Sequence, residues 1–178
     1  MLKGHKVDLA IMEKGDLPII RDWLNDVDII GEFENFHQVT LAQHEKRYDD
    51  GKDERNDFFV QKKDGTKIGI IQHFKAGDQV EIGYVLVPGE RGKGYGSEAV
   101  QIMVDYLFLH KNIVRIQAMT HTANIASQRV LEKAGFKKEG IIRKTLFTRG
   151  VWTDRAMFSI LRDEWKEPKE LPQGYVQK

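Results

Sequence analysis

The segment from Val85 to Ala99 constrains this chain more than any other, because a strand, a glycine-dense turn and a helix follow one another there. The turn contains four glycines: Gly89, Gly92, Gly94 and Gly96. Glycine lets successive backbone N–H groups turn toward one point, since no Cβ blocks the bend or the approach of a ligand. These donors precede a helix N-terminus, where the macrodipole favours an anion, and Arg91 and Lys93 add positive charge. The segment therefore predicts a site for a phosphorylated cofactor.

Two familiar phosphate-binding patterns fit this turn poorly. The phosphate loop of nucleotide hydrolases needs Ser or Thr directly after its lysine, whereas Gly94 follows Lys93 here. The glycine spacing matches the dinucleotide fingerprint, which also expects an acidic residue about 20 residues later, at the end of the next strand. That strand is expected at 113–120, and no Asp or Glu lies between Asp105 and Glu132. A dinucleotide site therefore remains only as the weaker alternative.

A third pattern, Arg-x-x-Gly-x-Gly, is formed by Arg91, Gly94 and Gly96. In this pattern the chain resembles the GNAT superfamily of acetyl-CoA-dependent N-acetyltransferases, whose pyrophosphate-binding loop lies between a strand and a long helix. A second block resembles the branch that contains ribosomal-protein N-terminal and polyamine acetyltransferases. Its matching positions are Asn124, Ser127, Gly135, Phe136, Glu139, Gly140, Arg143, Gly150 and Asp154. The resemblance covers roughly residues 5–166.

The resemblance implies an α/β fold, a single GNAT-like domain with a mixed, mostly antiparallel central sheet flanked by helices. A chain of 178 residues is long enough for one domain with a substantial core. We expect the N-acetyltransferase domain to span residues 1–166 and a polar C-terminal tail to span 167–178.

Local patterns predict the order of the elements. Thr40 and Gln43 form a capping-box pattern that predicts the start of a helix. Asp64-Gly65 and Gly77-Asp78 predict turns between strands. The other expected elements are strands at 7–11, 58–62, 67–75, 79–87, 113–120, 141–148 and 151–161, and helices at 16–25, from 96 onward, and at 125–134.

Composition excludes several other classes of protein. Hydrophobic content of 40% and charged content of 31% are typical of a soluble globular protein. A net charge of +1 gives no reason to expect nucleic acid or an anionic membrane as the main partner. The sequence shows no signal peptide and no apolar run long enough for a membrane span, so a cytoplasmic location is expected. The chain has no cysteine, so it can form no disulfide, no cysteine zinc site and no thiol nucleophile. No metal site is expected. Whether the protein forms a homodimer is left open by the sequence.

For the acetyl donor, the resemblance implies acetyl-CoA, held by the glycine turn and the strand before it. Backbone groups of Leu86 and Val87 are expected to polarise the acetyl carbonyl, as an oxyanion hole does. The expected cofactor contacts are Leu86, Val87, Arg91, Gly92, Lys93, Gly94, Tyr95, Gly96, Ser97, Asn124 and Ser127. Asn124 and Ser127 also have a local explanation, because Asn is a good helix N-cap. Since no cysteine can carry the acetyl group, direct transfer to the acceptor is expected.

Glu81 and Ser127 are the expected catalytic residues. An amine with lysine-like basicity is mostly protonated at neutral pH, so some group must take its proton. Relatives often carry a carboxylate at the position of Glu81, although a solvated residue at a strand edge is the alternative. The resemblance places Ser127 near the thioester sulfur, where many GNAT enzymes use a tyrosine instead. Some N-terminal acetyltransferases have a catalytic glutamate at the position where this chain has Leu146. His73 and His121 could titrate near neutral pH, but a structural role is expected for both.

Acidic residues gather between Arg21 and Lys46, a segment that contains no Lys or Arg. They are Asp22, Asp26, Asp28, Glu32, Glu34 and Glu45. An acidic lining would concentrate a cationic acceptor, whereas an ordinary solvated face is the alternative. The residues expected to contact the acceptor are Glu32, Glu34, Phe36 and Tyr84.

The class of acceptor stays open at this point. The resemblance favours a protein N-terminal amine of the ribosomal-protein type, and a small polycation such as a polyamine or an aminoglycoside is the alternative. A catalytically silent acyl-CoA-binding module is a third reading, and only the missing glutamate at Leu146 supports it.

Overall fold

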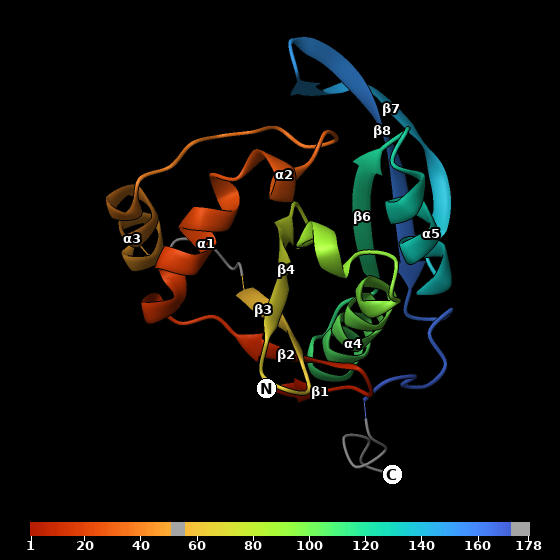
Figure 1. Ribbon diagram of the computed structural model, residues 1–178. Helices are drawn as coiled ribbons and strands as arrows, with labels where there is room; N and C mark the ends of the chain where they lie inside the picture. Colours follow the sequence, from red (N-terminus) through yellow and green to blue (C-terminus); the bar gives the residue numbers. More distant parts are fainter. Residues whose placement is uncertain (51–55, 172–178) are drawn as a thin grey trace.

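Within the residues that the computed structural model describes, 1–50 and 56–171, an eight-stranded sheet forms the centre of the molecule (Figure 1). In their order across the sheet, the strands are β1 Leu2–Lys3, β2 Val7–Ile11, β3 Asn56–Lys62, β4 Lys67–Ala76, β5 Gln79–Leu86, β6 Arg115–His121, β8 Val151–Leu161 and β7 Lys137–Thr148. Neighbouring strands run antiparallel except β5 and β6, which run parallel. A parallel pair needs a crossover connection, which α4 (Tyr95–His110) supplies.

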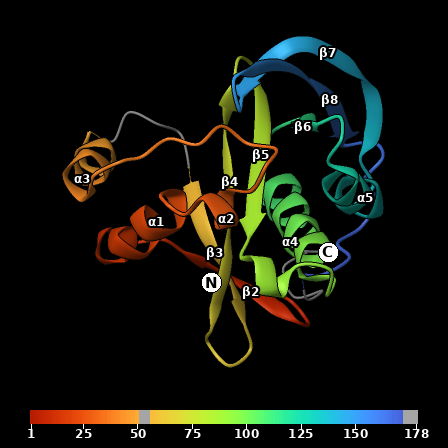
Figure 2. The same ribbon diagram turned by 45° about the horizontal axis from the view of Figure 1, so that its top comes forward.

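Helices cover both faces of the sheet (Figure 2). On one face lie α4 and α5 (Ile125–Lys133). On the other lie α1 (Leu17–Leu24) and the short α2 (Val27–Ile30), while α3 (Leu41–Asp49) packs against α1. Two 3₁₀ turns, η1 (Lys14–Asp16) and η2 (Pro88–Glu90), precede α1 and α4.

Side chains that alternate along the strands give the sheet an apolar layer on each face. On β3, Phe58 and Val60 belong to the core under α4, whereas Phe59 packs in the core under α1 with Ile20. The ring of Phe58 lies 6.0 Å from that of Tyr106 on α4. Because successive strand residues point to opposite faces, one strand supports both layers.

The predicted fold class is confirmed, and several local predictions hold in detail. The capping box at α3 is present, since Gln43 N donates to Thr40 Oγ1 (3.2 Å) and Thr40 N donates to Gln43 Oε1 (2.8 Å). The sequence did not predict β1 and α2, because segments of two and four residues are too short for a periodic pattern. Strand β7 begins at Lys137, four residues before the start expected at 141. The prediction missed these residues because 137–140 are mostly polar and show no alternation of apolar and polar side chains.

The β7–β8 hairpin is long and curved (Figures 1 and 2), and Glu139 anchors its base. The Glu139 carboxylate accepts two hydrogen bonds of 2.6 Å from the guanidinium of Arg115 on β6. It also accepts one of 2.6 Å from Ser159 Oγ on β8. This carboxylate therefore ties three neighbouring strands together, so the Glu-Gly motif has a structural role here.

Asp105 of α4 holds the segment that follows β8. Its carboxylate accepts hydrogen bonds from Trp165 Nε1 (2.8 Å) and from the backbone N–H groups of Lys169, Glu170 and Leu171. Residues 172–178 of the expected tail lie outside the described residues, and the domain boundary at residue 166 stays a prediction. Within the described ranges, no helix is both long enough and apolar enough to cross a membrane.

Candidate active site

Strands β5 and β6 part from each other soon after they meet. They pair only at Val80–Ile116 and Glu81–Gln117. Beyond these pairs, β5 stays paired with β4 and β6 stays paired with β8. A gap therefore opens in the middle of the sheet, and it widens from Glu81 toward the glycine turn at the end of β5.

Some backbone groups at the wide end of this gap already form hydrogen bonds within the protein. The Val87 N–H donates to the Ile68 carbonyl (2.9 Å), and the Leu86 carbonyl accepts from Arg91 Nε (2.9 Å). The expectation that Val87 donates to the acetyl carbonyl is therefore not supported by this geometry. The Leu86 N–H stays a predicted donor.

The glycine turn leaves the start of α4 open to a ligand. Gly92 and Gly94 have φ of 78° and 88°, a left-handed conformation that L side chains rarely adopt. Gly94 is the N-cap residue of α4, and no side chain in the described part of the chain caps the first-turn N–H groups. A Cβ at Gly92 would meet no atom of the described residues within 4 Å. Uncapped N–H groups at the positive end of a helix of 16 residues form a favourable site for a phosphate group.

Arg91 and Lys93, the expected phosphate ligands, both contact other protein groups. Besides its bond to Leu86, Arg91 donates from Nη2 to the Ile29 carbonyl at the end of α2 (2.7 Å). The Lys93 ammonium bonds to Glu90 Oε2 (2.9 Å), whose carboxyl also pairs with Lys62. Arg91 thus joins α2 to the end of β5, and phosphate binding by these two side chains stays a prediction.

A third cation, Lys6, reaches the turn from the β1–β2 hairpin. Its ammonium would lie 3.6 Å from a Cβ placed on Gly94. The backbone N–H groups of Lys6 and Val7 donate to Glu98 Oε1, in the first turn of α4, at 2.6 and 3.1 Å. The hairpin is therefore fixed against the helix start. Sequence spacing gave no signal for this contact, because Lys6 and Glu98 are 92 residues apart in the chain.

Tyr84 and Ser127 connect β5 to α5 beside the gap. The Tyr84 hydroxyl lies 2.8 Å from Ser127 Oγ and 3.2 Å from the Ser127 carbonyl oxygen. Burial raises the pKa of Tyr84 to about 12, and the hydrogen bond to Ser127 opposes that rise. Asn124 Oδ1 accepts from Ser127 N (3.0 Å), so Asn124 is the N-cap of α5, as its local explanation predicts. Tyr84 was expected at the acceptor, but it points toward α5, on the same face of the sheet as α4.

Glu81 lies at the narrow end of the gap, on the other face. It is buried, and Gln117 Nε2 donates to its Oε2 (2.9 Å). Because residues two apart on a strand share a face, Glu81 is on the side of Val85, which packs with the residues under α1. The carboxylate is therefore separated by the sheet from the start of α4.

The acidic segment divides into structural and exposed parts. Asp26 caps α2 by accepting from the N–H groups of Asp28 and Ile29. Glu32, Glu34 and Phe36 are all exposed residues of the described structure. Desolvation raises the pKa of the Glu34 carboxyl, and the charge of Arg155 on β8 opposes that rise. The Glu34 carbonyl also accepts a hydrogen bond from Thr148 Oγ1 at the end of β7 (2.9 Å), so this part of the segment lies beside the β7–β8 hairpin.

The remaining polar candidates have structural surroundings. His73 is buried against the rings of Phe58 and Tyr106. His121 Nδ1 accepts from Ala123 N (3.0 Å), and its ring lies 5.2 Å from that of Phe33. These contacts agree with the structural role expected for both histidines.

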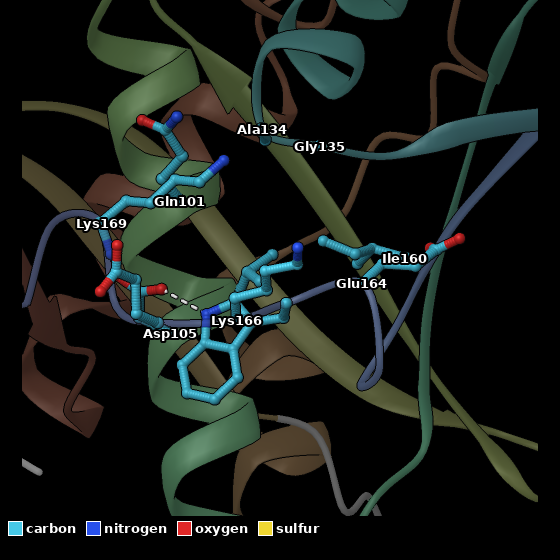
Figure 3. Close-up of a pocket in the computed structure, with 11 residues that line it drawn as sticks. Gln101, Asp105, Ala134, Gly135, Ile160, Glu164, Lys166 and Lys169 are labelled. Atoms are coloured by element: carbon cyan, nitrogen blue, oxygen red, sulfur yellow. Dashed lines mark hydrogen bonds between the residues drawn. The ribbon is translucent and has the colours of Figure 1, made fainter.

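A cavity of about 310 Å³ lies away from the gap (Figure 3). It is lined by Gln101 and Asp105 of α4, by Gly135 at the end of α5 and by Lys166 and Lys169 after β8. Trp165, whose indole bonds to Asp105, also borders it. The cavity thus belongs to the contact between α4 and the C-terminal segment. Among the described residues, no cluster of His, Asp and Glu could hold a metal ion.

Three comparisons with known proteins agree with one another. Residues 7–137 match the acetyltransferase (GNAT) domain family. The probable N-acetyltransferase YjcK of Bacillus subtilis is 38% identical to this chain over 129 residues, which cover 70% of each protein. The putative ribosomal N-acetyltransferase YdaF of the same species is 32% identical over 110 residues, which cover 60% of each protein. The crystal structure of spermidine N-acetyltransferase from Vibrio cholerae in complex with CoA and spermine has a TM-score of 0.81 at 22% identity, over 89% of this chain and 97% of that one.

Proposed function

This chain belongs to the GNAT acetyltransferase family, and we propose that it transfers the acetyl group of acetyl-CoA directly to a primary amine across the gap between β5 and β6. That the chain is an N-acetyltransferase and uses acetyl-CoA follows from the family. The parting of the two strands after Glu81 carries the proposal of direct transfer. Beyond the pair that Glu81 forms with Gln117, the described residues of β5 and β6 are not hydrogen-bonded to each other, so the donor on the face of α4 and the amine on the face of Glu81 are proposed to meet between them.

The donor side fits the diphosphate of acetyl-CoA. Backbone N–H groups from Gly92 to Ser97 surround the uncapped start of α4, and Lys6 adds a nearby positive charge. When bound, acetyl-CoA supplies an acetyl group activated as a thioester. Ser127, on α5 beside the gap, is the proposed contact for the thioester sulfur.

On the acceptor side, we assign proton removal to Glu81. Its carboxylate is buried and held by Gln117, so the side chain has a fixed position at the narrow end of the gap. Glu81→Gln should lower turnover by roughly 10²–10⁴-fold, because an uncharged amide cannot take the proton of the attacking amine. The affinity for CoA should hardly change, since Glu81 and the start of α4 lie on opposite faces. Unchanged turnover across a full pH series would remove Glu81 from the mechanism.

For the acceptor itself, a protein N-terminal amine is the leading proposal. The similarity to the putative ribosomal N-acetyltransferase supports this class. A small polycation is the second candidate, which the acidic segment around Glu32 and Glu34 supports. An acetyl-transfer screen should therefore compare peptides with free N-termini, the same peptides with blocked N-termini, and linear polyamines. Transfer to polyamines without transfer to free N-terminal peptides would reverse the order of the two candidates.

The double variant Glu32→Gln/Glu34→Gln tests the acidic segment. If these carboxylates attract a cationic acceptor, the change should raise the KM of that acceptor more than it lowers kcat. Added salt should have the same effect on the unaltered enzyme, because it screens the attraction. Asp78→Asn/Glu132→Gln removes two exposed carboxylates elsewhere and is the matched control. If both double variants behave alike, the acidic segment is an ordinary solvated face.

A further inference from the structure

The hydrogen bond between Tyr84 and Ser127 has two alternative arrangements. Tyrosine has one O–H to donate, and two acceptors of Ser127 lie within reach, at 2.8 Å (Oγ) and 3.2 Å (carbonyl oxygen). If Tyr84 donates to the carbonyl, the serine hydroxyl can donate to Tyr84. If Tyr84 donates to Oγ, the serine hydrogen can turn toward a third atom. A sulfur in the gap would be such an atom.

Neither hydroxyl is suited to give its proton away. Burial keeps Tyr84 protonated in any ordinary assay, because it raises the pKa of the phenol to about 12. A free thiol has a pKa of about 8.5, so a thiolate is a weaker base than either deprotonated side chain. The useful contribution to a departing thiolate is therefore a hydrogen bond, and hydrogen bonds to an ion are the stronger kind.

We propose that Tyr84 positions the Ser127 hydroxyl by donating to Ser127 Oγ, so that Ser127 donates to the sulfur of the departing coenzyme A. This rests on the proposed function, which places the thioester beside Ser127. In the transfer step, the amine nitrogen forms a bond to the acetyl carbon, and the C–S bond breaks with its electron pair on sulfur. The proton of the amine passes to Glu81, while Tyr84 and Ser127 keep theirs. Tyr84 is thus a positioning residue.

Binding at several pH values tests this without any turnover. Calorimetry would compare CoA with desulfo-CoA, which lacks the sulfur, between pH 7 and 9.5. A hydrogen bond to the thiolate should tighten CoA binding with rising pH relative to desulfo-CoA, by about 10-fold over this range. Tyr84→Phe should remove most of this dependence and leave desulfo-CoA binding unchanged, which also shows that the variant is folded. Tyr106→Phe, which loses a hydroxyl on α4 outside the gap, should behave like the unaltered protein.

Kinetics separates this proposal from the proposed function. Tyr84→Phe should lower kcat about 10-fold with little change in the KM of acetyl-CoA. Since Tyr84 acts through Ser127, Tyr84→Phe/Ser127→Ala should lose no more than Ser127→Ala alone. Suppose that Ser127→Ala lowers both kcat and the pH dependence of CoA binding, but that Tyr84→Phe changes neither. The positioning role of Tyr84 is then overturned. If neither variant changes them, the placement of the sulfur beside Ser127 fails as well.

Discussion

The backbone conformation of single glycines decides how the chain enters α4. Gly94 has a φ of 88° and is the N-cap residue of the helix. Within residues 1–50 and 56–171, only the ammonium of Lys6 would lie within 4 Å of a Cβ placed there. The fold alone therefore leaves space at this position. The dihedral angle favours glycine here, and the proposed approach of a phosphate to the backbone would be a second reason for it.

Gly94→Val should weaken CoA binding by at least about 10-fold, because a side chain would stand between the phosphate and the backbone donors. The left-handed conformation should also cost about 1–2 kcal/mol of stability. Gly77→Val is the matched control, since Gly77 also has a positive φ (64°) and open surroundings, but lies in the β4–β5 turn at the other end of β5. Calorimetry and urea unfolding of both variants separate the two effects. Equal CoA affinity in the two variants would contradict the assignment of the turn.

At the scale of elements, the base of the β7–β8 hairpin depends on one carboxylate. The pKa of Glu139 is lowered to about 2, mainly by its hydrogen bonds to Arg115, with further contributions from Ser159 and the charge of Arg115. Its side chain is 40% exposed, so solvent screens part of the interaction. The carboxylate still orients three strands, because its two oxygens contact both β6 and β8.

Glu139→Gln should lower the free energy of unfolding at pH 7 by about 1 kcal/mol, the upper end for an exposed pair. A carboxyl whose pKa is lowered on folding stabilises the protein above its unfolded pKa, near 4.5. This stabilisation is lost as the pH falls from there toward 2. Urea unfolding at pH 7, 4.5 and 3 should therefore show the difference between variant and parent shrinking. A difference that stays constant down to pH 3 would contradict the role of the charge.

At the scale of the whole molecule, α4 and the sheet share one apolar layer that also encloses a histidine. His73 is 5% exposed, and no hydrogen bond to its Nε2 exists among the described residues. Burial is the main cause that lowers the pKa of His73. The positive charge of Lys111 lowers this pKa further, whereas the negative charge of Asp57 raises it. The folded state therefore favours the neutral form of this side chain.

Stability should fall as the pH drops below about 6.5, the pKa of an unperturbed histidine, because the unfolded chain then binds a proton that the folded His73 resists. Well above that value His73 is neutral in both the folded and the unfolded state, so it does not make the free energy of unfolding depend on pH. His73→Leu should flatten the dependence between pH 7.5 and 5.5, whereas His37→Gln, at an exposed site, should preserve it. Chemical unfolding at several pH values measures both slopes. A parent slope that survives in His73→Leu would show that another group causes it.

Features encoded by neighbouring residues could be predicted from the sequence. The capping box of Thr40 and Gln43, the turn at Asp64-Gly65 and the glycine entry to α4 all depend on a few consecutive positions. Partners distant in sequence could not be predicted, such as Lys6 at the glycine turn and the α2 carbonyl that accepts from Arg91. The direction of Tyr84 was missed for the same reason, since it depends on where α5 packs beside β5.

The two-pair contact between β5 and β6 also bears on the order in which substrates bind. The proposed donor site at the start of α4 and the carboxylate of Glu81 lie on opposite faces, so both substrates can be bound at the same time and no product has to leave before the second substrate binds. Initial rates measured against both substrates should therefore give intersecting double-reciprocal lines, the pattern of a ternary complex. Parallel lines would require the protein to hold the acetyl group covalently, although the chain has no cysteine to carry it.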